Sequence, residues 1–587
     1  MAPATRRPVR VAGASGGFSD RVRAIASLAM NEEVDVIVGD WLSEMTMTIH
    51  GTGKIRNLEQ MTQAATFEEK INYAMFAENF LDCFLPALAV NAGASDTELL
   101  AQLIDKKCRE MGHPLKIAWI EGDDVTGTVK SMLNKGEGFP SLMHNRSVEE
   151  WGLESTVAQC YLGGLGIAKA LSEGADIVIA GRVSDASQII GAAAWWHEWT
   201  SDQFNELSGS LIIGHLECAA YVSGGYCSDF LQLLAKGKHI NLGFPICAID
   251  QKGEGIMYKV KNTGGQMTVA SVTSQLLYEI QGPQYYNCDV TAQIENIKIE
   301  QVGEDQVKVS GVKGLPPPPT TKFTTLKFMQ NGASPIDARN QDVATVDFRV
   351  FAQSKDRELL NMRNPKGFFR ISMVTFLQSC PGASLGNDVR QAEGKPYYEY
   401  HPSLLPQSAL KQCVHCLWDG EEAQGYHDGK KAIDMPLAPK FREYARQQPS
   451  YETTNPVPRD AFGPTVRLPL GSIVLGRSGD KCSDCNVGFF VRYDDEWEWL
   501  RSVMTVEKVK ELLGSEEYKG KPIDRFEMPN VRAVHFLLHD HLDRGYDACS
   551  TYDTLGRTAA TFLSMQWNYE VYNSVRAFCA CVHQRNP

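Results

Sequence analysis

The sequence lacks the features that tie a protein to a membrane or to nucleic acid. No apolar run approaches the ~20 residues that a membrane-spanning helix needs. The formal net charge is −13, so the chain has no overall basic character with which to bind a phosphate backbone. We therefore expect no membrane partner and no nucleic-acid partner.

Motifs of several common enzyme classes are absent as well. The glycine-rich stretch near the N-terminus does not have the G-x-G-x-x-G spacing, and no Walker lysine follows it, so neither a dinucleotide nor an ATP fingerprint is present. The chain also has no H-E-x-x-H motif for a metalloprotease zinc. We further expect no G-x-S-x-G nucleophile elbow of the α/β-hydrolase kind, which favours a lyase over a hydrolase. Its chemistry has to be inferred from other residues.

Targeting signals are scarce. The N-terminal segment MAPATRRPVR contains three arginines but not the apolar core of a secretory signal. The fifteen cysteines are mostly dispersed singly, which is typical of reduced thiols rather than of a disulfide framework. We expect a cytoplasmic protein; the same arginines leave a mitochondrial address as the alternative.

Cysteine and histidine clusters do not predict a metal centre. The chain has two C-x₂-C pairs, Cys413 with Cys416 and Cys482 with Cys485. A Cys₄ zinc site pairs two such motifs within a short span, whereas these lie in different predicted domains. The His539-Asp-His541 stretch is explained more simply as polar residues at a strand end. No resident metal is predicted.

The most informative stretch is ADIVIAGRVSDASQIIGAAAWWH, residues 175–197. Its apolar β-branched beginning predicts a buried strand, and its alanine-rich end predicts a helix. Arg182, Ser184 and Asp185 stand between the two. In an open α/β sheet ligands bind beyond the carboxyl ends of the strands, so this cluster is a candidate site. The alternative is that Ser184 or Asp185 only caps the helix.

A second candidate lies at the N-terminus, where the first predicted strand ends in GASGG, residues 13–17. Loops of this kind let backbone N–H groups approach an anion at a helix N-terminus. Ser15, Gly16 and Gly17 are therefore candidate binding residues for a carboxylate or phosphate. The alternative is a tight turn without a ligand.

Five successive predicted strands end in glycine together with a polar or acidic residue. They alternate with helical segments such as 66–83 and 97–111, which favours a parallel sheet with its functional edge on one side. Converging carboxylates push their pKa values apart and so yield an acid and a base near neutral pH; alternatively, they would hold Mg²⁺. The carboxylates that follow strand ends are Asp40, Glu44, Glu121, Asp123, Asp124, Asp185 and Glu217.

Residues 211–218 are predicted to be extended, with His215 and Glu217 on one face. His215 would act as a general base, because an imidazole titrates near neutral pH; a structural hydrogen-bonding role is the alternative. The remaining candidate binding residues in this half of the chain are Asn91, Gly93, Gly224 and Gly225.

The second half of the chain has a different pattern of apolar and polar residues. Residues 243–380 alternate like hairpins and predict a mixed-sheet extension, so that residues 1–428 make up one α/β body. The proline-rich range 429–463 is the predicted linker, and 464–587 is a smaller α+β unit. In that unit Arg477 and Lys481 bracket a predicted turn that would bind an anion; a hairpin with solvated charges is the alternative.

Several motifs coincide, in order, with those of a known family. VRVAGASGGFSDR, VGDWLSE, NAGA, GADIVIAGRVSDAS, AAWWHEW and GHLECAAYVSGGY resemble the N-terminal domain of the acyclic terpene utilisation (AtuA-like) family. The tail, from GRSGDKCSDCNVGFFVRY to TYDTLGRT, is similar to the ferredoxin-fold domain of many members, although Cys482 replaces the usual glycine. The resemblance implies a Rossmann-like α/β body with a ferredoxin-like α+β domain. It also links the chain to a pathway that degrades branched acyclic terpenes through acyl thioesters.

Together these patterns predict an enzyme that acts on a small carboxylic acid or acyl thioester by acid–base chemistry, of lyase or hydratase type. The expected catalytic residues are Asp185 as base or acid, Arg182 as carboxylate or oxyanion partner, Glu217 or His215 as second proton carrier, and Asp40. Mg²⁺ and a coenzyme A thioester are the cofactor and substrate considered, and a homo-oligomer is expected. The alternatives are a hydrolase or lactone-forming acyl transferase, and a non-catalytic metabolite-binding or assembly protein.

Overall fold

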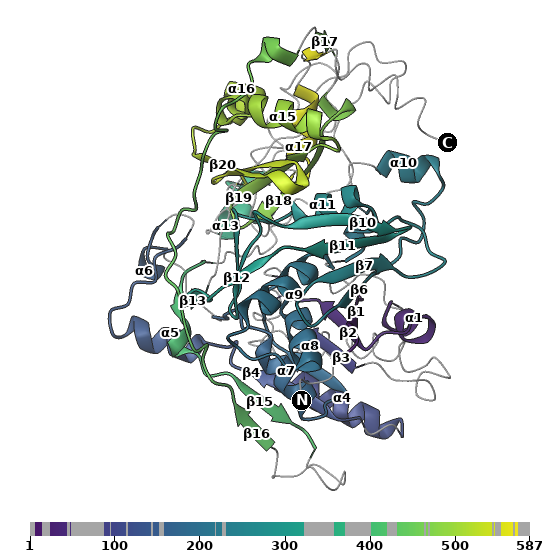
Figure 1. Ribbon diagram of the computed structural model, residues 1–587. Helices are drawn as coiled ribbons and strands as arrows, with labels where there is room; N and C mark the ends of the chain where they lie inside the picture. The colour runs from purple at the N-terminus through teal and green to yellow at the C-terminus, as the bar shows by residue number, and fades with distance from the viewer. Residues whose placement is uncertain are drawn as a thin grey trace.

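The computed structural model describes residues 6–14, 24–43, 47, 87–93, 96–112, 115–142, 145–151, 158–217, 219–225, 230–321, 357–369, 401–418, 431–462, 465–467, 470–542, 545, 553–566 and 570–572. A large α/β body carries a smaller C-terminal unit, drawn in light green to yellow, that stacks on one end of it (Figure 1). Within the described ranges, no helix is both long and apolar enough to cross a bilayer.

The body is built on an eleven-stranded mixed sheet with the order β10-β11-β7-β6-β1-β2-β3-β5-β4-β15-β16. Its centre is parallel, as the sequence predicts, so the carboxyl ends of these strands share one edge. The central strands are β1 (Val9–Gly13), β2 (Val36–Asp40), β3 (Ala87–Asn91), β5 (Ile177–Ala180) and β4 (Ile117–Glu121). The expected α/β architecture is confirmed.

Both faces of the central sheet are buried, and successive side chains alternate between two cores. On β2, for example, Val36 and Val38 join one core and Ile37 joins the other. Each such side chain contributes about 1.5–3 kcal/mol by its removal from water. The first core is covered by α7 (Leu165–Ser172), α8 (Ser187–His197) and α9 (Phe204–Leu216), and the second by α1 (Ala24–Asn31) and α4 (Thr97–Glu110).

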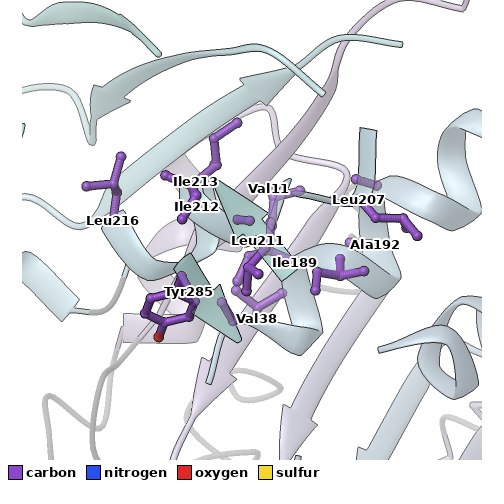
Figure 2. Close-up of a cluster of buried hydrophobic side chains, with 14 of the residues drawn as sticks. Val11, Val38, Ile189, Ala192, Leu207, Leu211, Ile212, Ile213, Leu216 and Tyr285 are labelled. Carbon is purple, nitrogen blue, oxygen red and sulfur yellow. The ribbon is translucent and has the colours of Figure 1, made fainter. Parts of the chain in front are cut away.

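The segment 211–216, predicted to be extended, is the second half of helix α9. Its apolar run Leu211-Ile212-Ile213 is buried on every side, and a short run of this kind does not distinguish a buried strand from a buried helix. Figure 2 shows α9 residues packed with Val11, Val38 and Ile189. The helix lies between α8 and a small sheet formed by β8 (Gln284–Tyr286), β9 (Thr291–Gln293) and β12 (Lys313–Leu315).

Antiparallel strands extend the sheet on both sides of the parallel centre. On one side lie β6 (Pro245–Ile249), β7 (Gly255–Lys259), β10 (Lys298–Gly303) and β11 (Gln306–Ser310), which form the expected mixed-sheet extension. On the other side lie β15 (Cys413–Cys416) and β16 (Lys431–Asp434), and β16 falls within the range predicted to be linker. The helix expected at 66–83 lies outside the described residues.

Shorter elements complete the body and its surface. They are α5 (Thr126–Leu133), α6 (Val148–Trp151), α10 (Phe230–Ala235), α11 (Val269–Leu276), α13 (Arg357–Leu360), β13 (Thr320–Thr321) and β14 (Leu405–Pro406). Helix α11 begins with a capping box between Thr268 and Ser271 and ends beside the small unit.

The C-terminal unit is a four-stranded antiparallel sheet in the order β18-β19-β21-β20 with helices packed on it. The strands are β18 (Leu475–Lys481), β19 (Asp484–Phe490), β20 (Ile523–Met528) and β21 (Ala533–Leu538), and the helices are α15 (Asp494–Val503), α16 (Val506–Glu517) and α17 (Ala559–Gln566). A separate two-stranded pairing joins β17 (Thr465–Arg467) to β22 (Glu570–Tyr572).

Residues 477–481, predicted to form a turn, belong to strand β18 instead. The turn comes afterwards, at Cys482, whose φ of 63° lies in the left-handed region that favours the glycine usual there. The glycine in RSGDK makes this segment look like a turn, but the glycine is needed for packing. A Cβ on Gly479 would lie 2.2 Å from the ring of Tyr278, which follows α11. Close packing, rather than chain reversal, is the reason for this glycine.

Polar contacts hold the C-terminal unit on the end of α11. The Asn486 side chain donates to the Leu277 carbonyl and accepts from the Glu279 N–H at 3.0 Å. A Cβ on Gly488 would lie 2.7 Å from Leu277, so the backbones approach closely here. The residues that end α11 are therefore positioned by both parts of the chain.

Within the C-terminal unit, His539 should make stability depend on pH. Its Nε2 lies 2.7 Å from Asp524 Oδ2 and its Nδ1 lies 3.6 Å from Asp484 Oδ2. Hydrogen bonds to Asp484 and Asp524 raise the pKa of His539 to about 10. The unfolded pKa is about 6.5, so the stabilisation is complete below about pH 6.5 and is lost as the pH rises through about 10.

The substitution His539→Gln should therefore lower the free energy of unfolding by about 1–2 kcal/mol at pH 6 and by much less at pH 10. Urea denaturation followed by fluorescence of the buried Trp497 and Trp499 measures this. An equal loss at both pH values would contradict the proposed charge interaction.

Candidate functional site

A partly open cavity lies at the carboxyl ends of β1 and β2, between α8, α9 and α11. Its walls combine a few apolar side chains with a dense set of polar and titratable groups. The lining residues are Gly13, Val38, Asp40, Asp185, Ala186, Gln188, Ile189, Gly214, His215, Glu217, Gln275, Tyr278 and Glu279. Of the predicted catalytic residues, four lie on this wall: Asp40, Asp185, His215 and Glu217.

Two glycines allow the walls to come this close. A Cβ on Gly214 of α9 would lie 2.6 Å from the Cβ of Ala186, and one on Gly13 of β1 would lie 2.6 Å from the carbonyl oxygen of Glu217. A larger residue at either position would separate the elements. The start of α8 and the end of α9 therefore reach the same cavity, which brings Asp185 and Glu217 to one site.

Asp185 is held in its ionised form by two cations. Its Oδ1 lies 3.1 Å from Nη1 of Arg182, and its Oδ2 accepts a hydrogen bond from Lys481 Nζ at 3.3 Å. Burial alone would raise the pKa of Asp185, but Lys481 and Arg182 outweigh it and lower the pKa below its usual range. Asp185 is therefore a weak base near neutral pH.

Arg182 does not line the cavity, although it was predicted to meet the substrate. Its side chain is buried, donates to the Val183 carbonyl at 3.1 Å and stacks on Tyr161 at 4.3 Å. These contacts point the guanidinium at Asp185 from behind. Arg182 is placed to position Asp185 and to set its charge.

The pKa of Asp40 is shifted in the opposite direction from that of Asp185. It lies half-buried at the end of β2, where the side chain of Asn91 donates to its Oδ1. Burial and the nearby Asp185 charge raise the pKa of Asp40 to about 7, against the lowering effects of Arg182 and Asn91. A carboxyl group with this pKa can both give and take a proton at neutral pH.

Glu217 is a buried carboxyl group in the cavity wall. Only 2% of the residue is exposed; the Cys247 backbone lies near its carboxyl group, but neither carboxyl oxygen has a partner at normal hydrogen-bond geometry among the described residues. The side-chain carbonyl oxygens of Gln188 and Gln275, in the same wall, also lack partners there. Burial raises the pKa of Glu217 well above its usual range. The protonated carboxyl and the two amides present free polar groups for a ligand.

His215 is less suited to proton transfer than predicted. Burial lowers its pKa, so the ring is neutral, and its Nε2 lies 3.4 Å from the Leu276 carbonyl oxygen. The ring also contacts Tyr285, with centroids 5.2 Å apart. His215 and Glu217 share the cavity through the C-terminal turn of α9 rather than through one face of a strand.

Two residues that the sequence reasoning did not assign, Tyr278 and Glu279, lie at the end of α11 in the cavity wall. Glu279 has a φ of 59°, a strained value for a side-chain-bearing residue, and its Oε2 accepts from Lys481 Nζ at 3.3 Å. Tyr278 lies under Arg477, whose Cζ is 4.4 Å from its ring centroid. The positions of Tyr278 and Glu279 depend on contacts with the C-terminal unit, and such long-range contacts have no local signal in the sequence.

The other predicted carboxylates do not join this cavity. Asp123 accepts from the Arg182 backbone N–H at 2.9 Å, Asp124 accepts from the Thr126 N–H at 3.0 Å, and Glu121 pairs with His415. Around the cavity, the described residues include no set of three metal-ligating atoms within mutual reach. Since Arg182 and Lys481 already neutralise Asp185, this arrangement does not fit Mg²⁺.

Of the predicted binding residues that the structure describes, none lines the cavity, and Asn91, Ser184 and Lys481 lie next to its wall. Asn91 positions Asp40 and also accepts from the Trp41 N–H; the hydroxyl of Ser184 lies 3.4 Å from Cys288 Sγ. The predicted residues whose positions are away from the wall are Gly93, Gly224, Gly225 and Arg477, while Lys481 contacts two wall carboxylates. Ser15, Gly16, Gly17 and Glu44 lie outside the described residues.

One further pattern bears on the site. Residues 13–17, GASGG, fit the G-x-S-x-G spacing of a nucleophile elbow directly after strand β1, whose last residue lines the cavity. The expectation that the chain has no nucleophile elbow is therefore wrong at the level of the motif. The match makes Ser15 a residue to test beside the carboxyl groups.

Two family models match the chain. The model of the acyclic terpene utilisation family protein AtuA matches residues 9–327 and 321–416, and the model of the AtuA ferredoxin-like domain matches residues 468–568. No curated protein and no solved structure matches. The two matched regions contain the cavity and the strand that supplies Lys481, and they confirm the resemblance found in the sequence.

Proposed function

The chain belongs to the AtuA family, and from that premise we propose that it is an enzyme that moves a proton at the α-carbon of a small carboxylic acid or acyl thioester, as a lyase or hydratase. The observation that carries this proposal is the pair Asp40 and Asp185. They share one cavity, and their surroundings drive their pKa values in opposite directions. Such a pair is typical of acid–base sites.

In this mechanism Asp40 is the residue that exchanges the proton. Its carboxylate takes the α-proton as the α C–H bond breaks, and the electron pair forms the enolate. The carboxyl group of Glu217, protonated because of its raised pKa, donates a hydrogen bond to the developing enolate oxygen. The β C–O bond then breaks, the proton on Asp40 joins the departing hydroxide as water, and the double bond forms. Hydration is the reverse.

Asp185 and Lys481 adjust this chemistry without taking the proton. The Asp185 charge raises the pKa of Asp40 toward neutrality. Lys481 offsets the charges of Asp185 and Glu279, so the cavity is not strongly repulsive toward an anionic substrate.

The first experiment is α-proton exchange in D₂O with a panel of coenzyme A thioesters, from acetyl and isovaleryl to 3-methylcrotonyl, read by mass spectrometry. We expect deuterium uptake, or hydration of the unsaturated member, by the wild-type protein. The control is Asp124→Asn, because this exposed carboxylate follows a strand of the same sheet but does not line the cavity. Binding of a thioester without exchange or hydration would favour the non-catalytic alternative.

The second candidate is a hydrolase that uses Ser15, favoured by the G-x-S-x-G match at the end of β1. It predicts release of free coenzyme A from a saturated thioester, and loss of that release in Ser15→Ala. The lyase proposal predicts that exchange survives Ser15→Ala and fails in Asp40→Asn. The two variants therefore separate the candidates.

A further inference from the structure

We propose that Glu121, Cys413 and His415 form a site for a zinc ion, on the face of the central sheet opposite the cavity. The ligands come from two neighbouring antiparallel strands, β4 and β15. Their donor atoms all lie within 4.8 Å of one another. The proposal is independent of the catalytic one.

The register of the two strands creates this cluster. Cys413 lies opposite Glu121, and His415 lies opposite Trp119, so the side chains of all four point to the same face of the sheet. The Nε2 of His415 is 2.7 Å from Oε2 of Glu121. The His415 ring stacks on the Trp119 ring, with centroids 4.2 Å apart and planes inclined by 9°. This stacking fixes the ring in the orientation that directs Nε2 at the cluster.

The donor types select the metal. One thiolate, one imidazole and one carboxylate suit Zn²⁺, whereas Mg²⁺ and Ca²⁺ prefer oxygen ligands alone. With metal–ligand bonds of about 2.0–2.3 Å, tetrahedral ligands are roughly 3.2–3.8 Å apart. The longest separation in the cluster, at most 4.8 Å, has to shorten by about 1 Å, whereas the 2.7 Å between His415 and Glu121 has to lengthen by about 0.5 Å. The exposed Glu121 side chain can supply the lengthening by a change of rotamer.

Asp434 lies beside the cluster but outside the set of donors within 4.8 Å of one another, so it would become a fourth ligand only after a change of rotamer. It lies opposite Cys413 on β16, and its carboxylate interacts with the Cys413 thiol. Three strands thus contribute one row of donors, Glu121, Cys413 and Asp434, with His415 beside it. A bound zinc would join β15 to β4, and ligation by Asp434 would add β16, the outermost strand of the sheet.

The site does not use the C-x₂-C motif that contains Cys413. Residues three apart on a strand point to opposite faces, and Cys416 is buried in the core that α7, α8 and α9 cover. In the other C-x₂-C pair, Cys485 is fully buried and its thiol contacts the Gly556 carbonyl oxygen. The functional spacing is therefore Cys413-x-His415, with a ligand from a distant strand.

Cobalt(II) is the probe, because thiolate ligation produces a charge-transfer absorption in the near ultraviolet. The metal-free full-length protein should show this absorption on titration with Co²⁺, and Zn²⁺ should displace it stoichiometrically. Cys413→Ser should abolish the band, and His415→Gln should weaken Zn²⁺ binding at least tenfold. The matched control is Cys416→Ala, from the same motif but the other face, which should keep the band.

Circular dichroism of each variant shows whether it is folded, so a missing band is interpretable. Absence of the band in the folded wild-type protein would overturn the proposal. So would a band that persists in Cys413→Ser or that disappears in the folded Cys416→Ala control. Binding should also weaken as the pH falls, because the thiol must release its proton to ligate the metal.

Discussion

Replacing Asp40 with asparagine should reduce α-proton exchange by about 10²–10⁴-fold and, at the same time, make the protein more stable. Asparagine keeps an oxygen that can accept from Asn91 but cannot carry the proton. The loss therefore concerns the rate constant, while substrate affinity changes little. Comparison of kcat and KM in the D₂O exchange assay separates the two.

The gain in stability follows from the raised pKa. Asp40 has a folded pKa of about 7 and an unfolded value near 3.8, so the folded state binds its proton more tightly. Stability then falls as the pH rises from about 4 to about 7, because the unfolded carboxyl is already ionised there. At about 1.4 kcal/mol per pKa unit, Asp40→Asn should stabilise the protein by about 2–4 kcal/mol at pH 8 and by less at pH 5. A variant that is less stable than wild type at pH 8 would contradict this assignment.

Replacing Lys481 with methionine should have the second-largest effect, a loss of about 10²-fold in exchange. The ammonium group lies 3.3 Å from both Asp185 and Glu279, and methionine keeps much of its length without its charge. The potential at Asp40 then becomes more negative, and its pKa should rise above about 7. The control is Lys521→Met in the same unit, which removes only an exposed pair with Asp540.

The titration of Asp40 can be followed without a substrate. Difference infrared spectra between the wild type and Asp40→Asn isolate its carboxyl stretch across a pH series. In Lys481→Met the midpoint should move up, whereas in Asp185→Asn it should move down, because a like charge is removed and two cations remain. Shifts in the same direction, or no shift, would contradict the electrostatic coupling of the three residues.

The parallel centre of the sheet was predictable, because each of its strands is a short apolar run followed by glycine or a polar residue. The meeting of Asp40 with Asp185 follows from that arrangement. The absence of Glu121 from the cavity wall could not be predicted in this way, because it depends on the strand order and on the face of the sheet to which its side chain points. Strand β4 lies beyond β5, and Glu121 points away from the helices that line the cavity. Neither fact has a local sequence signature.

The helical state of 211–216 was hidden for a different reason. The segment is apolar throughout and buried all round, so it shows neither the two-residue alternation of a strand nor the polar stripe of a surface helix. The approach of Lys481 to Asp185 was hidden because it depends on the docking of two separately folded sheets. The composition of residues 477–481 predicted an anion-binding turn, whereas in the structure this segment is a strand that packs against Tyr278.

The hairpin of β18 and β19 makes two contacts with the body of the protein, and the residues that make them lie close together. The side chain of Asn486 forms hydrogen bonds with the residues that end α11, and Lys481 places a positive charge at the wall of the cavity. Rotation of the small unit would withdraw that charge and release Glu279 in one movement, and the proton affinity of Asp40 would change with it. The acidity of the site is thus linked mechanically to how firmly the two halves of the molecule are held together.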